Sequence, residues 1–305
     1  MAGHLIHVGY PKAGSTWLQH WFEAHPELHY QAGGVAGFGS VYGLCHPLPD
    51  GYRYHVTSSE SLVAPHENTG AWGAGGHGGI PRWSGSFKGN QAEVCALLRT
   101  LFPASRILIT TRGFMGMLAS SYSQFVRTGG TLDPRRMCLP LIDPAPGPDD
   151  HAFDYDYLIG LYVEAFGAEN VIVLPYELLR DDEPRFLAIL EARLGVGHVD
   201  VEIGQVNPSL TPEELFWYPR MSRAVYAAAG RLPRRVRGPL LGVYGRQVFH
   251  GRLRALARGL SRARPGTVTR ADFPDEVLRG CAGRAERLRH DPLYAPYAAE
   301  YLWSE

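Results

Sequence analysis

The sequence predicts an α/β fold in three layers, with a central parallel sheet, a P-loop-like phosphate-binding strand–loop–helix at its start, and a helical C-terminal third. Three observations support this fold class. Apolar runs typical of buried parallel strands alternate with helical patterns over residues 1–195. A glycine-containing turn follows the first run directly, and residues 196–305 hold mostly helical patterns interrupted by Pro and Arg. We expect one domain over residues 1–305, in which 1–195 form a nucleotide-binding core and 196–305 an Arg-rich extension.

The elements follow each other at the pace of βαβ units. The first strand is predicted at residues 4–10, and Ser15 or Thr16 can cap the helix after the turn. Further strands are predicted at 54–58, 106–111 and 171–174, and further helices at 90–102, 114–127, 153–166 and 183–194. Residues 30–49, 70–89 and 128–150 form irregular loops. Ligands of parallel sheets bind beyond the carboxyl ends of the strands, so we expect the site there.

From the composition we expect a globular protein without a membrane anchor or an export signal. Hydrophobic residues make up 45% of the 305 residues, which is enough for a sizeable core. No apolar run reaches the length of about 18 residues that spans a bilayer, and the N-terminus begins with a strand-like segment. Cys45, Cys95, Cys138 and Cys281 form no C-x-x-C pair. They predict neither a zinc site nor a disulfide framework and fit a reducing cytoplasm.

Charge is unevenly distributed, although the formal net charge is zero. Residues 1–214 hold 13 Lys or Arg and 23 Asp or Glu, which gives −10, whereas residues 215–305 hold 17 and 7, which gives +10. No acidic residue occurs from Leu215 to Ala271. This asymmetry indicates either an anionic partner for the C-terminal third or a solvated basic face.

The first loop contains one of only two lysines in the chain. Arginine occurs 28 times, whereas lysine occurs only as Lys12 and Lys88. A compact ammonium differs chemically from a planar guanidinium. Residues 9–16 join a strand to a helix N-terminus, where backbone N–H groups and the helix dipole favour an anion. The hydroxyls of Ser15 and Thr16 add hydrogen-bond donors.

The position of the lysine separates this turn from a Walker loop. In the pattern G-x-x-x-x-G-K-[ST] the lysine follows the second glycine. Here Ser15 follows Gly14, and Lys12 lies two residues before that glycine. A lysine inside the turn reaches over a shorter substituent than a triphosphate, which suits one phosphate bearing one transferable group. The alternative is an ordinary strand-to-helix turn with an incidental lysine.

The segment Tyr10–Leu18, Y-P-K-A-G-S-T-W-L, resembles the 5′-phosphosulfate loop of sulfotransferases that use 3′-phosphoadenosine 5′-phosphosulfate (PAPS). The resemblance implies that Lys12 contacts the phosphosulfate and acts as the catalytic acid on the leaving oxygen. It also implies that Trp17 packs against the adenine. The other loop residues expected to bind the donor are Ala13, Gly14, Ser15 and Thr16.

A second signature of that family binds the 3′-phosphate with an Arg at a strand end and a Ser eight residues later. Here Arg112 follows the strand 106–111, and Ser120 lies eight residues further on. Arg can fork onto a phosphate with two hydrogen bonds. Singly, Arg112 could serve in a structural ion pair and Ser120 could face solvent. The block 171–194, with Tyr176 after its strand, also resembles the family, which implies a donor-binding position for Tyr176 and extends the resemblance over residues 4–196.

The chain departs from the family pattern in two places. Gly113-Phe114-Met115-Gly116 replaces the usual Asn-Pro after the arginine. The R-K-G loop of the cytosolic hormone- and drug-conjugating branch is absent from the C-terminal third. The chain therefore resembles the bacterial or Golgi-type carbohydrate members more closely. The groups that close over the 3′-phosphate are not identified by the sequence.

Transfer to a hydroxyl requires a base near the acceptor oxygen. The K-x-H of the cytosolic branch is absent, and the segment that follows the second predicted strand ends in Glu60. Golgi-type members use a glutamate in a comparable position, so Glu60 is the first candidate. His66 and His55 are the alternative bases, and Glu60 could instead be a surface or capping carboxylate. No metal is expected, because Lys and Arg supply the positive charge.

The acceptor site is predicted less specifically than the donor site. The Gly-rich segment 70–89 holds Trp72, Trp83 and Lys88 and is a candidate acceptor lid, or else an irregular excursion. Aromatic side chains suit sugar faces and aromatic rings equally. We expect an acceptor with a hydroxyl or amine group, such as a glycan, a lipid or a secondary metabolite, and no nucleic acid.

The Arg-rich segment 231–264 could contact acidic glycans or a membrane surface, or simply cap the core. In its second half an apolar side faces an arginine side. The apolar side is formed by Leu253, Leu256, Ala257 and Leu260, and the arginine side by Arg252, Arg254, Arg258 and Arg262.

Two other function classes stay open. The strand–loop–helix also suits an ATP-dependent small-molecule kinase, but the missing lysine after Gly14 and the pair of Arg112 and Ser120 argue against it. The third hypothesis is a noncatalytic module that binds nucleotides or glycans.

Overall fold

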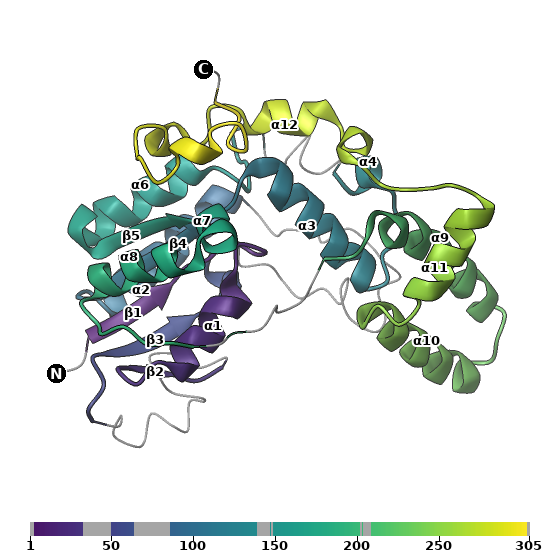
Figure 1. Cartoon of the computed structure of the whole chain (residues 1–305), viewed down its shortest axis with the longest axis horizontal. Helices are drawn as coiled ribbons and strands as arrows, with labels where there is room; N and C mark the ends of the chain where they lie inside the picture. Colours follow the sequence, from purple (N-terminus) through teal and green to yellow (C-terminus); the bar gives the residue numbers. More distant parts are fainter. Residues whose placement is uncertain are drawn as a thin grey trace.

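The computed structural model describes residues 3–32, 50–63, 86–138, 147, 149–201, 203 and 209–303. Within these ranges five parallel strands form one sheet in the order β2-β3-β1-β4-β5 (Figure 1). The strands are β1 (Gly3–His7), β2 (Leu28–Tyr30), β3 (Tyr54–Ser58), β4 (Arg106–Thr111) and β5 (Val171–Pro175). β1 is the central strand, so the loop after it lies in the middle of the carboxyl edge of the sheet.

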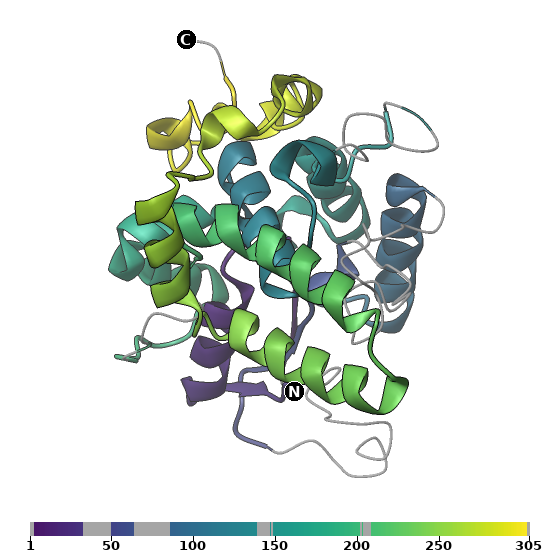
Figure 2. The ribbon, with the colours of Figure 1, turned by 90° about the vertical axis from the view of Figure 1, so that its right-hand side faces the viewer.

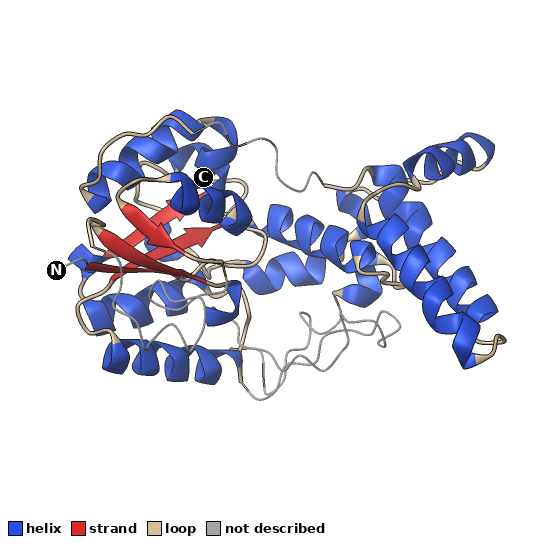
Figure 3. Ribbon diagram, turned by 90° about the horizontal axis from the view of Figure 1, so that it is seen from below, coloured by secondary structure: helices blue, strands red, loops and turns tan. Residues whose placement is uncertain are grey.

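Helices cover both faces of this sheet, as Figure 3 shows. Side chains of β1 alternate between two apolar clusters, with Leu5 on one face and Ile6 on the other. The Leu5 face packs against α1 (Ser15–Ala24) and α8 (Glu183–Leu194). The Ile6 face packs against α2 (Phe87–Leu101) and α6 (Tyr155–Phe166). The predicted three-layer α/β class is therefore confirmed.

The C-terminal third is helical, and α3 (Phe114–Arg127) leads toward it from the end of β4 (Figure 1). The remaining described α-helices are α4 (Pro134–Met137), α7 (Tyr176–Asp181), α9 (Pro212–Ala229), α10 (Arg234–Phe249), α11 (Arg254–Ala263) and α12 (Asp275–Cys281). Short 3₁₀ helices lie at Glu60–Leu62, Ala168–Asn170, Arg270–Asp272, Glu286–Leu288 and Ala295–Tyr297. None of the described helices is both long and apolar enough to cross a membrane.

The end of the chain returns to the sheet and covers the end of β4. The hydroxyls of Tyr294 and Tyr301 each lie 2.9 Å from Oγ1 of Thr111. The backbone N–H of Phe114 donates to the carbonyl oxygen of Glu300 over 2.9 Å. The start of α3 is therefore held from both sides, by β4 and by the C-terminal segment.

Several predicted bounds match the structure, and others shift for identifiable reasons. The strands at 54–58 and 106–111 and the helices at 114–127 and 183–194 are found as predicted. β2 and α7 were not predicted, because three- and six-residue elements leave little periodic pattern. The first strand ends at His7 rather than at residue 10, and α6 begins at Tyr155, where Asp154 caps it.

Helix α2 begins at Phe87, three residues before the predicted start at residue 90. Ser86 Oγ accepts from the N–H of Gly89 over 3.0 Å. The carboxylate of Asp150 accepts from the N–H groups of Phe87 and Lys88 over 2.7 and 2.8 Å. A distant carboxylate thus satisfies the orphan donors of the first turn, which local sequence does not reveal.

The three cysteines in the described ranges, Cys95, Cys138 and Cys281, are buried free thiols. Cys45 lies outside those ranges.

Candidate functional site

The loop between β1 and α1 has the backbone of an anion-binding turn. Lys12 and Gly14 both have left-handed conformations, with φ of 69° and 87°. The N–H of Ala13 donates to the carbonyl oxygen of Tyr10 over 3.2 Å, which closes the turn. Gly14 is the N-cap of α1, and no described side chain caps this helix. The first N–H groups of α1 therefore remain available for an anion.

The loop packs closely against α7, and this close contact leaves no room for a Cβ at position 14. A Cβ on Gly14 would lie 3.0 Å from Tyr176 Cδ2 and 3.0 Å from Leu179 Cδ2. Both neighbours come from α7, directly after β5. The predicted donor-binding residue Tyr176 is thus in contact with the loop, although 162 positions separate it from Gly14.

Arg112 connects the loop with the end of β4. Its Nη1 donates to the carbonyl oxygen of Lys12 over 2.5 Å. The guanidinium carbon lies 4.4 Å from the centre of the Tyr176 ring, in a cation–π contact. The hydroxyl of Tyr155 donates to the carbonyl oxygen of Arg112 over 2.5 Å. The structure therefore brings Lys12, Arg112 and Tyr176 together.

One face of α3 runs from Arg112 toward the ammonium of Lys12. Residues four apart share a helix face, and Gly116, Ser120 and Gln124 are spaced in this way. The position of a Cβ on Gly116 lies 3.1 Å from Nε of Arg112. At the other end Nζ of Lys12 donates to Oε1 of Gln124 over 3.5 Å. Ser120 lies between them on the same face and is only 7% exposed.

Gln124 is a site residue that sequence reasoning missed. Its position four residues after Ser120 was the available signal, because a helix that presents Ser120 to a ligand presents Gln124 on the same side. A glutamine in a helix carries no chemical signature of its own, so its contact with Lys12 became evident only in the structure.

Glu60 lies beside Lys12, as the first residue of the 3₁₀ helix after β3. Burial raises the pKa of Glu60 above its ordinary value, while the Lys12 ammonium and the Lys12 backbone N–H oppose the rise. Burial likewise lowers the pKa of Lys12, where the Glu60 charge opposes the shift and the charges of Arg127 and Arg112 reinforce it. Each group therefore affects the pKa of the other, although no ion pair within 4.0 Å joins these two described side chains.

The Ser15 hydroxyl also lies near the carboxyl group of Glu60. Ser15 is only 2% exposed, and its Oγ completes no hydrogen bond within the described residues. It lies close enough to the Glu60 carboxyl to lower its pKa, although the geometry is not that of a full hydrogen bond. A buried hydroxyl without a good partner, at a helix start without a side-chain cap, is a fitting place for an anionic group.

The remaining loop residues differ in their exposure. Ala13 is buried, Thr16 is exposed and Trp17 is half-buried. The Trp17 ring packs at the border of the apolar cluster between α1 and α8. Burial raises the pKa of Glu183 in α8, and the indole N–H of Trp17 partly opposes this rise. Stacking of Trp17 on an adenine stays a prediction.

Of the alternative bases, only His55 is described, and it lies at the other end of β3. It stands opposite His4 in the register of β1 and β3, near the amino ends of both strands. Its Nδ1 is 3.2 Å from Nδ1 of His29. The structure therefore places Glu60, and not His55, beside Lys12. His66, Trp72 and Trp83 lie outside the described residues.

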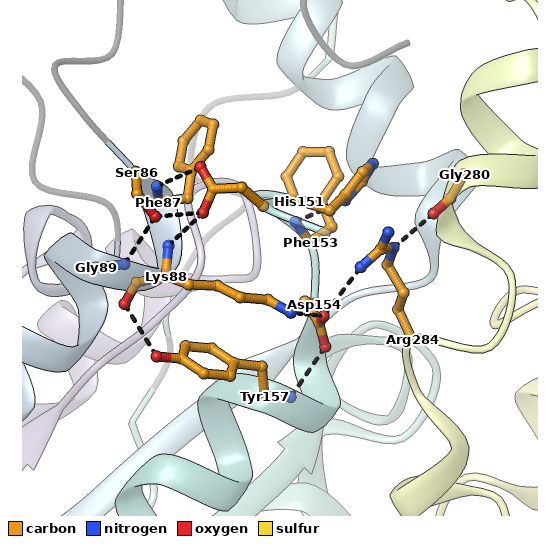
Figure 4. A network of polar contacts seen from close by, with 11 residues as sticks. Ser86, Phe87, Lys88, Gly89, His151, Phe153, Asp154, Tyr157, Gly280 and Arg284 are labelled. Atoms are coloured by element: carbon orange, nitrogen blue, oxygen red, sulfur yellow. Dashed lines mark hydrogen bonds and ion pairs between the residues drawn. The ribbon is translucent and has the colours of Figure 1, made fainter. Parts of the chain in front are cut away.

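Lys88 takes part in a polar network at the starts of α2 and α6 (Figure 4). Its Nζ is 2.8 Å from Oδ2 of Asp154, and Nη1 of Arg284 is 3.0 Å from the same oxygen. The ammonium also lies 4.8 Å from the centre of the Tyr157 ring. Lys88 belongs to the first turn of α2 rather than to a loop, and its charge is already paired. A contact with the acceptor stays a prediction.

Comparisons with known proteins find similarity only at the level of the fold. No protein-family model matches the chain, and no curated protein matches it. Among solved structures, a sulfotransferase from Alicyclobacillus acidocaldarius aligns with a TM-score of 0.47 and 16% identity, covering 68% of this chain and 87% of its own. Mouse sulfotransferase SULT7A1, complexed with PAP, aligns with a TM-score of 0.47 and 13% identity, covering 98% and 89%. The function proposed below rests on this chain's own residues.

Proposed function

We propose that this chain is a sulfotransferase that moves a sulfuryl group from PAPS to a hydroxyl or amine of a glycan, a lipid or a small metabolite. The observation that carries the proposal is the meeting of Lys12, Glu60 and Arg112 at the carboxyl edge of the sheet. They follow three different strands, and they supply a cation for a leaving phosphate, a carboxylate for a proton and a second cation. Direct in-line transfer needs these groups together.

The described residues fit an adenosine nucleotide that carries one phosphate at its 5′ position and another at its 3′ position. The N–H groups at the start of α1, together with the Ser15 hydroxyl, would hold the 5′-phosphosulfate. Arg112 and Ser120 would hold the 3′-phosphate, at the end of β4 and on the adjoining face of α3. The product left in the site is 3′,5′-adenosine bisphosphate (PAP).

In the proposed step Glu60 acts as the base and Lys12 as the acid. Glu60 takes the proton of the acceptor hydroxyl, and the raised pKa that burial produces makes it a stronger base than an exposed glutamate. The acceptor oxygen forms its bond to sulfur while the bond from sulfur to the bridging phosphate oxygen breaks. Lys12 stabilises the departing phosphate and gives that oxygen a proton, which its lowered pKa favours. That Lys and Arg replace a metal ion is part of the proposal.

A transfer assay tests the proposal directly. Labelled PAPS is supplied with a library of sugars, lipids and metabolites, and products are identified by mass spectrometry. We expect a sulfated product, and a loss of about 10²–10³ in turnover for Lys12→Ala, as when one oxyanion donor is removed. The unfolding midpoint of Lys12→Ala should stay close to that of the original protein. Undiminished turnover in Lys12→Ala would contradict the assigned role.

Ligand-induced thermal shifts separate the proposal from its alternatives. A sulfotransferase should be stabilised by PAP without magnesium. A small-molecule kinase should be stabilised by ATP–Mg²⁺ and not by PAP. Tight binding of PAP with no transfer to any acceptor would favour a noncatalytic module. A cytoplasmic location and an acceptor other than nucleic acid are part of the proposal.

A further inference from the structure

Helix α10 carries a row of exposed aliphatic side chains. Val236, Leu240 and Val243 are 52%, 41% and 47% exposed, although they are spaced like one face of a helix. The opposite side of α10 packs on α9 and α3, and Val248 is its one buried residue. Figure 2 looks onto α9 and α10, which lie side by side at the surface. The row therefore has no cover within the described chain.

The segment that contains this row is rich in arginine and holds no acidic residue. Residues 231–264 hold ten arginines and no Asp or Glu. Only Arg254 of these ten has a carboxylate partner in the described part of the chain, Glu214, at 3.1 Å. Arg235 and Arg246 are exposed and flank the aliphatic row on one side of the helix. The surface combines exposed apolar groups with unpaired positive charge.

Helix α11 likewise exposes both an aliphatic side chain and arginines. Of the apolar side predicted there, Ala257 is buried, whereas Leu256 is 50% exposed. Arg258 and Arg262 are exposed as well. Leu256 is therefore a further exposed aliphatic side chain in the Arg-rich segment 231–264.

We propose that the exposed face of α10, with the arginines around it, docks onto the surface of a membrane that contains anionic lipids. The aliphatic row would enter the boundary between headgroups and acyl chains, and the guanidinium groups would stay at the level of the phosphates. This binding is peripheral and is independent of the proposed sulfotransferase activity.

Two other occupants fit the chemistry less well. A second copy of the chain, related by two-fold symmetry, would place arginines against arginines with no acidic partner between them. An acidic glycan would pair with the arginines but would leave Val236, Leu240 and Val243 without a counterpart. A membrane with anionic headgroups offers negative charge to the arginines and an apolar layer beneath it to the aliphatic row.

Vesicle sedimentation with the full chain tests the proposal. The probes are vesicles of phosphatidylcholine alone and vesicles that also contain phosphatidylserine. We expect binding to the anionic vesicles only, weakening as salt concentration rises. Each arginine near the surface contributes about a fivefold gain in affinity, so Arg235→Gln together with Arg246→Gln should weaken binding about 25-fold. Leu240→Ser with Val243→Ser should weaken it at least about tenfold.

Matched variants on another surface serve as controls. Leu97 and Leu101 on α2 are 56% and 57% exposed, so Leu97→Ser with Leu101→Ser removes similar apolar area elsewhere. Arg136→Gln removes a charge that is 65% exposed. Both controls should leave vesicle binding unchanged.

Three results would overturn the proposal. One is equal or absent binding to the two kinds of vesicle. Another is retention on immobilised heparin that depends on Arg235 and Arg246, combined with no vesicle binding, which would assign the surface to acidic glycans. The last is a dimer in analytical ultracentrifugation that Leu240→Ser with Val243→Ser dissociates. Circular dichroism of each variant verifies that α10 remains folded.

Discussion

Arg112 donates a hydrogen bond to the main-chain carbonyl oxygen of Lys12, across 100 positions of sequence. The same guanidinium lies over the ring of Tyr176, which in turn contacts Gly14. The two halves of the proposed donor site are therefore linked through the protein itself. A change at Arg112 should alter the phosphate loop as well as remove a charge.

Arg112→Lys should weaken the binding of PAP by about tenfold or more. A lysine cannot both stack on Tyr176 and direct a fork of donors at a phosphate, and a hydrogen bond to a charged group contributes about 1.5–3 kcal/mol. Isothermal titration calorimetry measures this affinity without knowledge of the acceptor. Arg106→Lys is the control, since Arg106 contacts the carbonyl oxygen of Arg193 instead. Equal affinity in Arg112→Lys and the original protein would remove Arg112 from the donor site.

Gly14→Ala should destabilise the protein more than Gly51→Ala. Both glycines have left-handed backbones, with φ of 87° and 91°, so the two changes share the conformational cost. The Cβ at position 14 meets Tyr176 and Leu179 at 3.0 Å, whereas the Cβ at position 51 meets no atom of the described residues within 4 Å. Overpacking adds about 1–3 kcal/mol for Gly14→Ala. Urea unfolding of both variants measures the difference. Equal decreases in the free energy of unfolding would show that α7 shifts to accommodate the extra methyl group.

Turnover should fall at both acidic and alkaline pH, which gives the pH profile an acid limb and an alkaline limb. Glu60 must be ionised to accept a proton, and its pKa is raised, so activity should fall on acidification at a pH above 4.5, the ordinary value. Lys12 must be protonated, and its pKa is lowered, so activity should fall on the alkaline side at a pH below 10.5, the ordinary value. The ratio kcat/KM for PAPS, measured across this range, tests both limbs, because it reports the pKa values of the free enzyme.

Single substitutions assign these limbs. Glu60→Gln should remove the acid limb together with most of the turnover. Lys12→Arg should move the alkaline limb upward, because a guanidinium does not lose its proton in this range. An acid limb that persists in Glu60→Gln would mean that another group is the base.

Asp150→Asn should destabilise the start of α2, whereas Asp149→Asn should not. The Asp150 carboxylate accepts from Phe87 N, Lys88 N and the Ser86 hydroxyl, at distances of 2.7 to 2.8 Å. An amide turns one acceptor into a donor, which leaves donors facing each other at a cost of about 1–3 kcal/mol. Hydrogen exchange at residues 87–90 and urea unfolding measure the effect. Equal protection in the two variants would show that Ser86 alone suffices as the cap.

Glu60 illustrates how far the sequence reaches into the site. Its position after a predicted strand indicated a place at the carboxyl edge of the sheet, since parallel strands end there together. The sequence did not show that β1 and β3 are neighbours, and it is this neighbourhood that brings Glu60 to Lys12. His55 was an alternative base in the sequence, but it lies near the amino end of β3, whereas Glu60 follows the carboxyl end of that strand.

Lys88 and Gln124 are residues whose positions could not be predicted from the sequence. Lys88 was predicted in a Gly-rich loop, because the carboxylate that starts α2 at Phe87 comes from Asp150, far along the chain. Gln124 was not predicted, because its meaning depends on which face of α3 turns toward Lys12. In both cases the deciding contact joins residues more than sixty positions apart.

The sequence by itself determined the α/β class, the strand–loop–helix around Lys12 and the placement of Arg112 at a strand end. Hydrophobic period, turn glycines and the spacing of charged residues are local properties, and local backbone preferences act on them directly. The tertiary structure decided the strand order, the start of α2, the proximity of Glu60 to Lys12 and the exposure of Val236, Leu240 and Val243. These depend on packing between distant segments, and burial then determines both the pKa of each group and which apolar faces remain uncovered.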